Sequence, residues 1–247
     1  MLYAGTGSML AVAVSPDPYR LNMKTPYTFP VDAILLLGPT GVGKSPLGDV
    51  IAQNGLFGRT CRHLDFGSEL RGAISGGQRS AAYSTAELDF IHGVLERGLL
   101  LENEHFLLAK KIISLYLDRV GFAQHEVLVL NGIPRHAGQA SDIATLAAIH
   151  TVVILDCSAD DVVCRIRENV GGDRTERVDD NMELVDKKLS IFRERTEPLI
   201  NHYTQRGCAL YRISVSADMT PSEAYCKVSA LAAAYPPVTL VAEPPQR

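Results

Sequence analysis

The sequence predicts an α/β fold in which a parallel sheet is covered by helices on both faces, a doubly wound arrangement. Short apolar runs, typical of strands buried on both sides, alternate along the chain with segments of helical periodicity. The first run, 31–37, leads into a glycine-rich loop, after which Leu47, Val50 and Ile51 follow at helical spacing. With 247 residues, 46% of them hydrophobic, the chain can bury one sizeable core.

The remaining elements follow in order. Residues 61–66 predict a second strand, and a helix opens within 67–75 with Ser68 as its N-cap. Further helices are expected at 85–97, 102–119, 137–149, 160–169, 181–205 and 221–233, and further strands at 125–132, 151–158 and 209–216. The polar, glycine-containing segment 170–177 is expected to be a loop.

The two ends of the chain differ from the middle in composition. Residues 1–30 carry glycine, serine and several prolines, and we expect a disordered N-terminal extension. Residues 235–247 form a proline-rich tail outside the fold, which leaves 31–234 as the folded domain. No apolar run approaches the roughly 20 residues of a membrane span, and the N-terminus lacks the basic flank of a signal peptide.

The net charge and the cysteine content argue against several classes of protein. The formal net charge of −4 argues against a nucleic-acid or membrane-surface binder. The five cysteines include no C-x-x-C pair, which argues against a disulfide framework or a structural zinc site and favours a cytoplasmic protein.

The loop after the first strand matches G-x-x-x-x-G-K-[ST], a phosphate-binding pattern. In this pattern backbone N–H groups surround a polyphosphate, the lysine reaches the outer phosphates and the serine hydroxyl faces Mg²⁺. The predicted fold is therefore of the P-loop NTPase type. The expected ATP-binding residues are Gly38, Pro39, Thr40, Gly41, Val42, Gly43, Lys44 and Ser45.

Ligands of such sheets bind at the carboxyl ends of the strands. The segment after the second strand reads GSELR and contains Arg71, and the segment after the third reads NGIPRHAGQ and contains Arg135. Arginine forks suit phosphate oxygens, which they bind in bidentate fashion. These two residues are therefore candidates for a second phosphate site.

Five segments, GSELRGAIS, GLLLE, LNGIPRHAGQA, RVDDN and FRERTEPLINHY, occur in one order at familiar spacings. Together they resemble the adenylate kinase family of nucleoside monophosphate kinases, over about residues 31–234. The resemblance implies a core that binds ATP, an inserted helical lobe at about 65–101 that binds the monophosphate, and a short lid at about 169–180.

The resemblance also implies roles for individual residues. Arg71 and Arg135 would grip the acceptor phosphate beside Gly67 and Gly132, and Gln139 would read the acceptor base. Lys44 would bridge the outer ATP phosphates and Ser45 would face Mg²⁺. The other implied residues are Arg165 and Arg177, which would swing in from the lid region, Lys188 at a catalytic arginine position, and Asp179 and Asp180, which would anchor the lid or hold Mg²⁺-bound water. The acidic pair could equally be a helix N-terminal charge cluster.

Departures from the family pattern affect the metal and the lid. Asn131 stands where the family usually has an aspartate near Mg²⁺, Asn169 where it has a lid arginine, and Lys188 where it has another arginine. Lys188 keeps the charge without the bidentate fork. Lys188 lies four residues after Leu184 and four before Phe192, so in a helix the three side chains share one face, which we expect to point inward.

The predicted function is Mg²⁺-dependent transfer of the ATP γ-phosphate to a nucleoside monophosphate, with AMP as the leading acceptor, by a monomer. UMP, CMP or another acceptor is an alternative, as is a nucleotide-binding module with weak or no turnover. An ATPase is a further alternative, because Asp156 ends an apolar run in the manner of a magnesium aspartate.

Overall fold

The computed structural model describes residues 26–172 and 182–237. Five strands form one sheet in the order β2-β3-β1-β4-β5, and every neighbouring pair is parallel. The strands are β1 (Val31–Leu37), β2 (Cys61–Asp65), β3 (Val127–Asn131), β4 (Ala147–Asp156) and β5 (Ala209–Ser214). The predicted α/β fold with a parallel sheet is confirmed.

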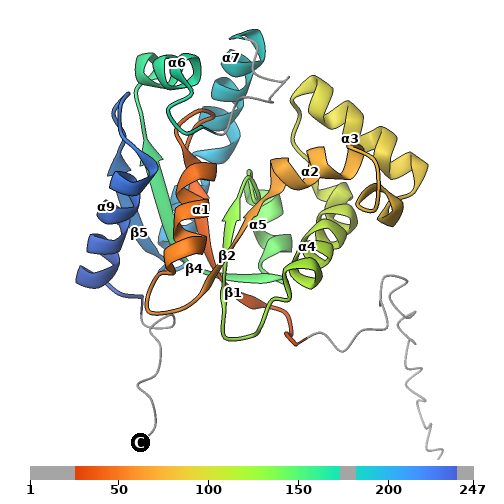
Figure 1. Ribbon diagram of the computed structural model, residues 1–247, viewed down its shortest axis with the longest axis horizontal. Coiled ribbons are helices and arrows are strands. Elements are labelled where there is room, and N and C mark those ends of the chain that lie inside the picture. Colours follow the sequence, from red (N-terminus) through yellow and green to blue (C-terminus); the bar gives the residue numbers. More distant parts are fainter. Residues whose placement is uncertain (1–25, 173–181, 238–247) are drawn as a thin grey trace, which may run out of the picture.

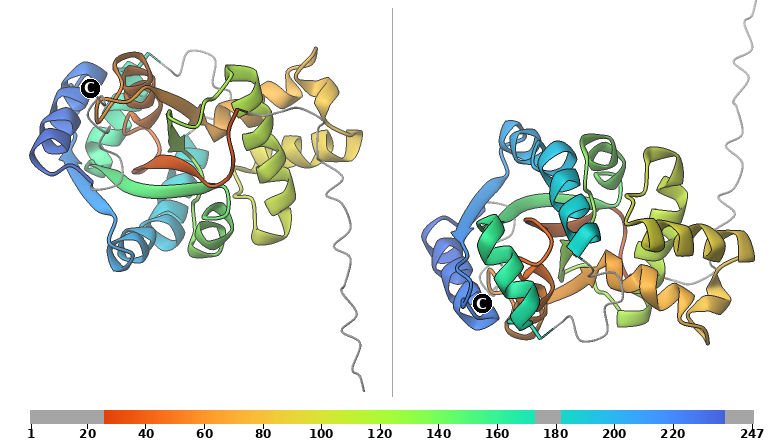
Figure 2. Two further views of the ribbon diagram at one scale, coloured as in Figure 1. Left: turned by 90° about the horizontal axis from the view of Figure 1, so that it is seen from below. Right: turned by 90° about the horizontal axis from the view of Figure 1, so that it is seen from above.

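Helices cover both faces of this sheet. The helices are α1 (Lys44–Asn54), α2 (Phe66–Ile74), α3 (Thr85–Arg97), α4 (Phe106–Val120), α5 (Ala137–Ile143), α6 (Ala159–Glu168), α7 (Met182–Ile191), α8 (Leu199–Gln205) and α9 (Pro221–Ala234). Short 3₁₀ turns span Ser80–Ala82 and Asn103–His105, and a π-helical segment spans Phe192–Thr196. Figure 2 shows α1 and α9 on one face of the sheet and α5 and α8 on the other.

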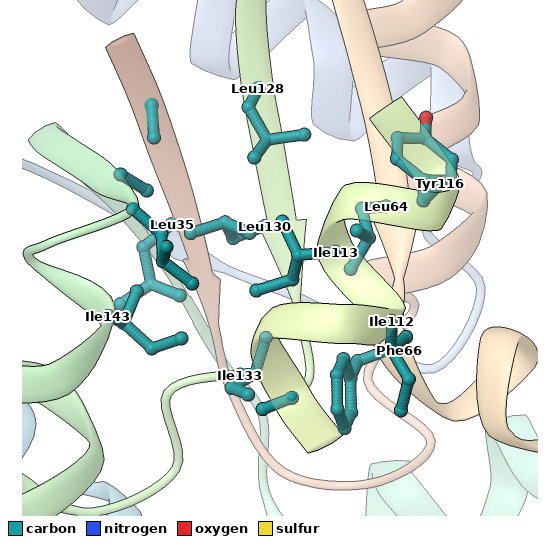
Figure 3. Close-up of a cluster of buried hydrophobic side chains, with 14 of the residues drawn as sticks. Leu35, Leu64, Phe66, Ile112, Ile113, Tyr116, Leu128, Leu130, Ile133 and Ile143 are labelled. Carbon is teal, nitrogen blue, oxygen red and sulfur yellow. The ribbon is translucent and has the colours of Figure 1, made fainter. Parts of the chain in front are cut away.

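The alternation of β1 side chains explains why both faces are covered. Leu35 and Leu37 belong to a core that includes residues of α4 and α5, whereas Ile34 and Leu36 belong to a second core with residues of α1 and α9. A strand buried on both faces reads as a continuous apolar run, as 31–37 does. Figure 3 shows the first core, in which side chains of the central strands meet Ile112 of α4.

Several helix ends follow from local capping. Ser84 and Thr220 each form a capping box, with Glu87 and Glu223 respectively, and so fix the starts of α3 and α9. The N-cap of α2 is Asp65, whose carboxylate accepts the Ser68 N–H, so the prediction of Ser68 as the cap was wrong. Asp65 is the better cap because the chain turns directly from β2 into the helix.

Two predicted helices were too long. The helix expected over 137–149 ends at Ile143, because Ala147 onward extends into β4 and pairs with the start of β1. The helix expected over 181–205 is divided by the π-helical segment and by Pro198, which precedes α8.

The carboxyl ends of the strands lie at the upper edge of the sheet in Figure 1, with α2 and α3 on one side of that edge and α6 and α7 on the other. Helices α2, α3 and α4 all lie between β2 and β3 in the chain. None of the helices in the described ranges is both long and apolar enough to cross a membrane.

Candidate active site

A cleft opens at the carboxyl edge of the sheet and joins the glycine-rich loop to the two arginines predicted from the sequence. Its walls come from segments far apart in the chain, including the loop after β1, the start of α2, the end of α3 and the loop after β3. The polar and glycine residues that line it include Gly38, Thr40, Gly41, Gly43, Lys44, Ser45, Asp65, Gly67, Arg71, Asn131, Gly132, Arg135, Gln139, Lys188 and Thr196.

The phosphate loop, residues 38–45, runs from β1 into α1. Gly43 is the N-cap of α1 and has a φ of 100°, in the left-handed region that glycine adopts without strain. Gly38 approaches the β4 backbone so closely that an added Cβ would lie 2.7 Å from the Leu155 carbonyl oxygen. Backbone N–H groups at the α1 N-terminus are thus available to an anion.

The side chains of Thr40, Lys44 and Ser45 line the cleft, whereas that of Val42 does not. The Lys44 ammonium donates hydrogen bonds of 2.7 Å to the carbonyls of Gly38 and Pro39. Val42 is buried in the core that contains α1, so its side chain faces away from a ligand.

Arg71 and Arg135 both line the cleft, and we refer to them as the cleft arginines. Within the described residues, no hydrogen bond or ion pair engages either guanidinium group. Burial lowers the pKa of Arg135 to about 10, and it therefore remains a cation at neutral pH.

In residues 26–172 and 182–237, five other arginines form ion pairs with carboxylates. These pairs are Arg59–Asp32, Arg62–Glu126, Arg119–Glu69, Arg195–Glu102 and Arg212–Asp156. A desolvated cation without a carboxylate is costly. The cleft arginines have no such partner in the described residues, and both line the cleft that contains the phosphate loop.

The backbone of Arg135 is fixed from two sides. Its N–H donates to Gln139 Oε1 at 2.7 Å, and its carbonyl accepts the Thr196 hydroxyl at 2.8 Å. Gln139 Nε2 donates to the Leu101 carbonyl at 2.7 Å, so both ends of this buried amide are in use. The amide has a second N–H and a second oxygen lone pair, so reading a base would not require either bond to break.

Arg165, which was predicted to act from the lid region, lies beside the phosphate loop. It lies in the last turn of α6, is 4% exposed, and its Nη1 donates to the carbonyls of Ser216, Ala217 and Met219. Its Nη2 lies 3.1 Å from where a Cβ on Gly43 would be. The guanidinium is therefore held beside the phosphate loop, because its burial requires the three carbonyl acceptors.

Lys188 of α7 lines the cleft, in agreement with the inward-pointing helix face expected from the sequence. Asn169 ends α6 as its C-cap with a φ of 49°, a left-handed conformation that asparagine tolerates, so this position has a structural role. Arg177, Asp179 and Asp180 lie outside the described residues.

Asp156, considered above as a magnesium aspartate, forms an ion pair of 2.6 Å with Arg212 of β5 and does not line the cleft. The carboxylate that does line it is Asp65, which sequence reasoning missed. Asp65 accepts a hydrogen bond from the Ser45 hydroxyl and one of 3.1 Å from Asn131 Nδ2. Its position at the end of β2, beside the expected ligand edge, was the signal that could have revealed it.

These residues can hold a polyphosphate with its cation. Magnesium prefers oxygen ligands and takes few of them from the protein. The Ser45 hydroxyl and the Asp65 carboxylate lie together at the phosphate loop and supply such oxygens. In the described ranges no group of three or more His, Cys, Asp or Glu side chains could hold a metal ion.

Comparison with known proteins finds relatives of this chain. The chain is 31% identical over 181 residues to "Adenylate kinase" of Synechococcus sp. (strain RCC307), covering 70% of this chain and 85% of that protein. The chain belongs to the adenylate kinase family. It is also 28% identical over 204 residues to the protein of the same name from Deinococcus radiodurans, covering 79% of this chain and 93% of that one.

Two further comparisons add less. No family model matches the chain. A solved sugar kinase from Janibacter sp. HTCC2649 aligns with a TM-score of 0.45 at 14% identity, covering 87% of this chain and 100% of that one. That likeness to a solved structure is too low to bear on function.

Proposed function

We propose that this protein transfers the γ-phosphoryl group of ATP to AMP in a Mg²⁺-dependent reaction that yields two molecules of ADP. The observation that supports it best is the pair of cleft arginines, which have no carboxylate partner among the residues that the structure describes and line the same cleft as the phosphate loop. The relatives named adenylate kinase support the same class of reaction.

The donor end is the phosphate loop. The α1 N-terminus offers backbone N–H groups to the β- and γ-phosphates. Lys44 would exchange its bonds to the Gly38 and Pro39 carbonyls for phosphate oxygens. Magnesium, when bound, would neutralise phosphate charge, and Ser45 is the loop residue that would face it.

The acceptor end holds a second phosphate. A monophosphate has a second pKa near 6, so at neutral pH it is already an anionic nucleophile that needs no general base. The difficulty is repulsion between two anions, which Arg71, Arg135 and Lys188 would reduce while they hold the groups in line. An acceptor oxygen forms a bond to the γ-phosphorus as the bond to the bridging oxygen of ADP breaks.

The parts around the cleft have proposed roles. The helical segment 65–101 would hold the monophosphate, and the segment 169–180 would close over both substrates and exclude water. Gln139 would read the acceptor base, or it would hold the backbone of Arg135 in place through its bonds to the Arg135 N–H and the Leu101 carbonyl. We propose a monomer, since both ends of the cleft come from one chain.

The test is an assay of diphosphate formation with Mg²⁺-ATP and, in separate reactions, AMP, UMP, CMP, GMP or no acceptor. ADP formation that depends on AMP would support the proposal. Preference for another monophosphate would replace the acceptor, whereas nucleotide binding without product would leave a binding module. Hydrolysis without any acceptor would instead indicate an ATPase.

A further inference from the structure

The two carboxylate oxygens of Asp65 have separate partners. Oδ1 accepts the Ser68 N–H at 2.9 Å and caps α2. Oδ2 accepts the Ser45 hydroxyl and, at 3.1 Å, Asn131 Nδ2. One oxygen is therefore used by the fold, and the other faces the phosphate loop.

Strand pairing explains how Asp65 reaches a loop that follows a different strand. Asp65 and Asn131 are partners at the carboxyl ends of the parallel strands β2 and β3, so their side chains lie on the same face of the sheet. Asn131 is in turn the partner of Leu36, the second-last residue of β1, the strand that leads into the phosphate loop. The sheet thus places residues 65, 131 and 45 together.

Asn131 acts here as a donor. An ionised carboxylate only accepts hydrogen bonds, so the amide must direct its NH₂ group at Asp65. The same nitrogen lies 3.1 Å from Ser45 Oγ. Asn131 therefore holds the carboxylate in place through its amide hydrogens, which cannot bind a cation.

We propose that Asp65 is the metal-binding carboxylate of this site and acts together with the Ser45 hydroxyl on the nucleotide-bound Mg²⁺. The proposal rests on the function proposed above. Both side chains carry oxygen atoms, which are the ligands that Mg²⁺ prefers, and they are in direct contact beside the phosphate loop. The charge absent at Asn131 is thus supplied from the neighbouring strand.

The test measures how much Mg²⁺ increases the affinity of the protein for a nucleotide. The dissociation constant of a fluorescent ATP analogue is measured in EDTA and in saturating Mg²⁺, and their ratio gives the coupling between metal and nucleotide. We expect D65N to lower this ratio about 10–100-fold. In EDTA the variant should bind at least as tightly as the wild type, because a negative charge near the phosphates is gone.

Three further variants make the result specific. Asparagine and serine both keep an N-cap at position 65, so Asp65→Asn and Asp65→Ser should fold and should agree. D156N removes a carboxylate at the end of β4 that is paired with Arg212 outside the cleft, and should keep the wild-type ratio. The double variant D65N/N131D places a carboxylate at position 131, which is also in contact with Ser45. Its ratio of dissociation constants should therefore return most of the way to the wild-type value.

A wild-type ratio in both folded Asp65 variants would overturn the proposal, as would an equal loss in D156N. If D65N/N131D folds but its ratio stays as low as that of D65N, the negative charge beside Ser45 is not the cause of the metal effect. That result would also contradict the proposal. The experiment contains no monophosphate. Failure of AMP phosphorylation would therefore appear in the diphosphate assay and leave this measurement intact.

Discussion

The two edges of the sheet treat charge in opposite ways. At the amino edge, Asp32 binds both Arg59, at 2.7 Å, and His150, at 3.0 Å, and Glu126 pairs with Arg62. At the carboxyl edge the cleft arginines have no carboxylate partner in the described residues. The charges named at the amino edge are paired within the protein, whereas the cleft arginines are not, and we therefore expect substitutions at these two places to have opposite effects on stability.

The largest effect is expected at Arg135. R135A should lower kcat/KM for the acceptor about 10²–10³-fold, because a cation that stabilises developing charge is lost. The variant should unfold at the same temperature as the wild type or a higher one, since a desolvated charge is removed. Steady-state kinetics and thermal unfolding check both statements. R135K is the matched control and should recover only part of the activity, because lysine lacks the fork.

The opposite result is expected at Asp32. D32A leaves Arg59, whose side chain is only 13% exposed, without its carboxylate and should cost about 1–3 kcal/mol in the free energy of unfolding. Urea denaturation measures this loss. The activity per folded molecule should not change. A large drop in kcat would contradict the view that the charges at the amino edge contribute to stability and not to activity.

A smaller and pH-dependent effect is expected at Glu102. Its hydrogen bonds with Arg195 lower the pKa of the carboxyl. Because the pKa is depressed in the folded state, the stabilisation is complete above the ordinary glutamate value of about 4.3 and is lost as pH falls through the folded value. Both side chains are well exposed, so E102Q should cost less than about 1 kcal/mol at neutral pH.

The pH series provides the control for Glu102. The difference in unfolding free energy between E102Q and the wild type should be constant near neutrality and disappear in acid. A difference that persists when both proteins are measured well below pH 4.3 would mean that the ion pair is not its cause.

The smallest effect is expected at Asp156, which lies at the carboxyl edge and yet is paired. D156N removes an exposed ion pair with Arg212 and should change stability by less than about 1 kcal/mol and activity not at all. A kinetic assay that showed a large loss would revive the magnesium role for this aspartate and would show that location at the edge matters more than pairing.

Much of this organisation could be predicted from the sequence. The bounds of β1 and α3 were predicted correctly, because an apolar run before a glycine-rich loop and a capping serine are local signals. Arg71 and Arg135 were placed at the cleft by the rule that ligands bind at the carboxyl ends of parallel strands.

The failures required knowledge of the tertiary structure. Asp65 was counted as part of a strand that was expected to reach Phe66, and its contact with Ser45 depends on the strand order 2-3-1. The fixed position of Arg165 depends on carbonyls about fifty residues later in the chain. No local pattern encodes either contact.

The most direct test of the central claim is calorimetric titration with a bisubstrate analogue that joins two adenosines through five phosphates. If one cleft holds donor and acceptor together, one analogue should bind per chain, far more tightly than ADP, and R135A should weaken binding about 100-fold or more, as expected for a buried charge-assisted contact. Binding no tighter than that of ADP, or unchanged in R135A, would contradict the account.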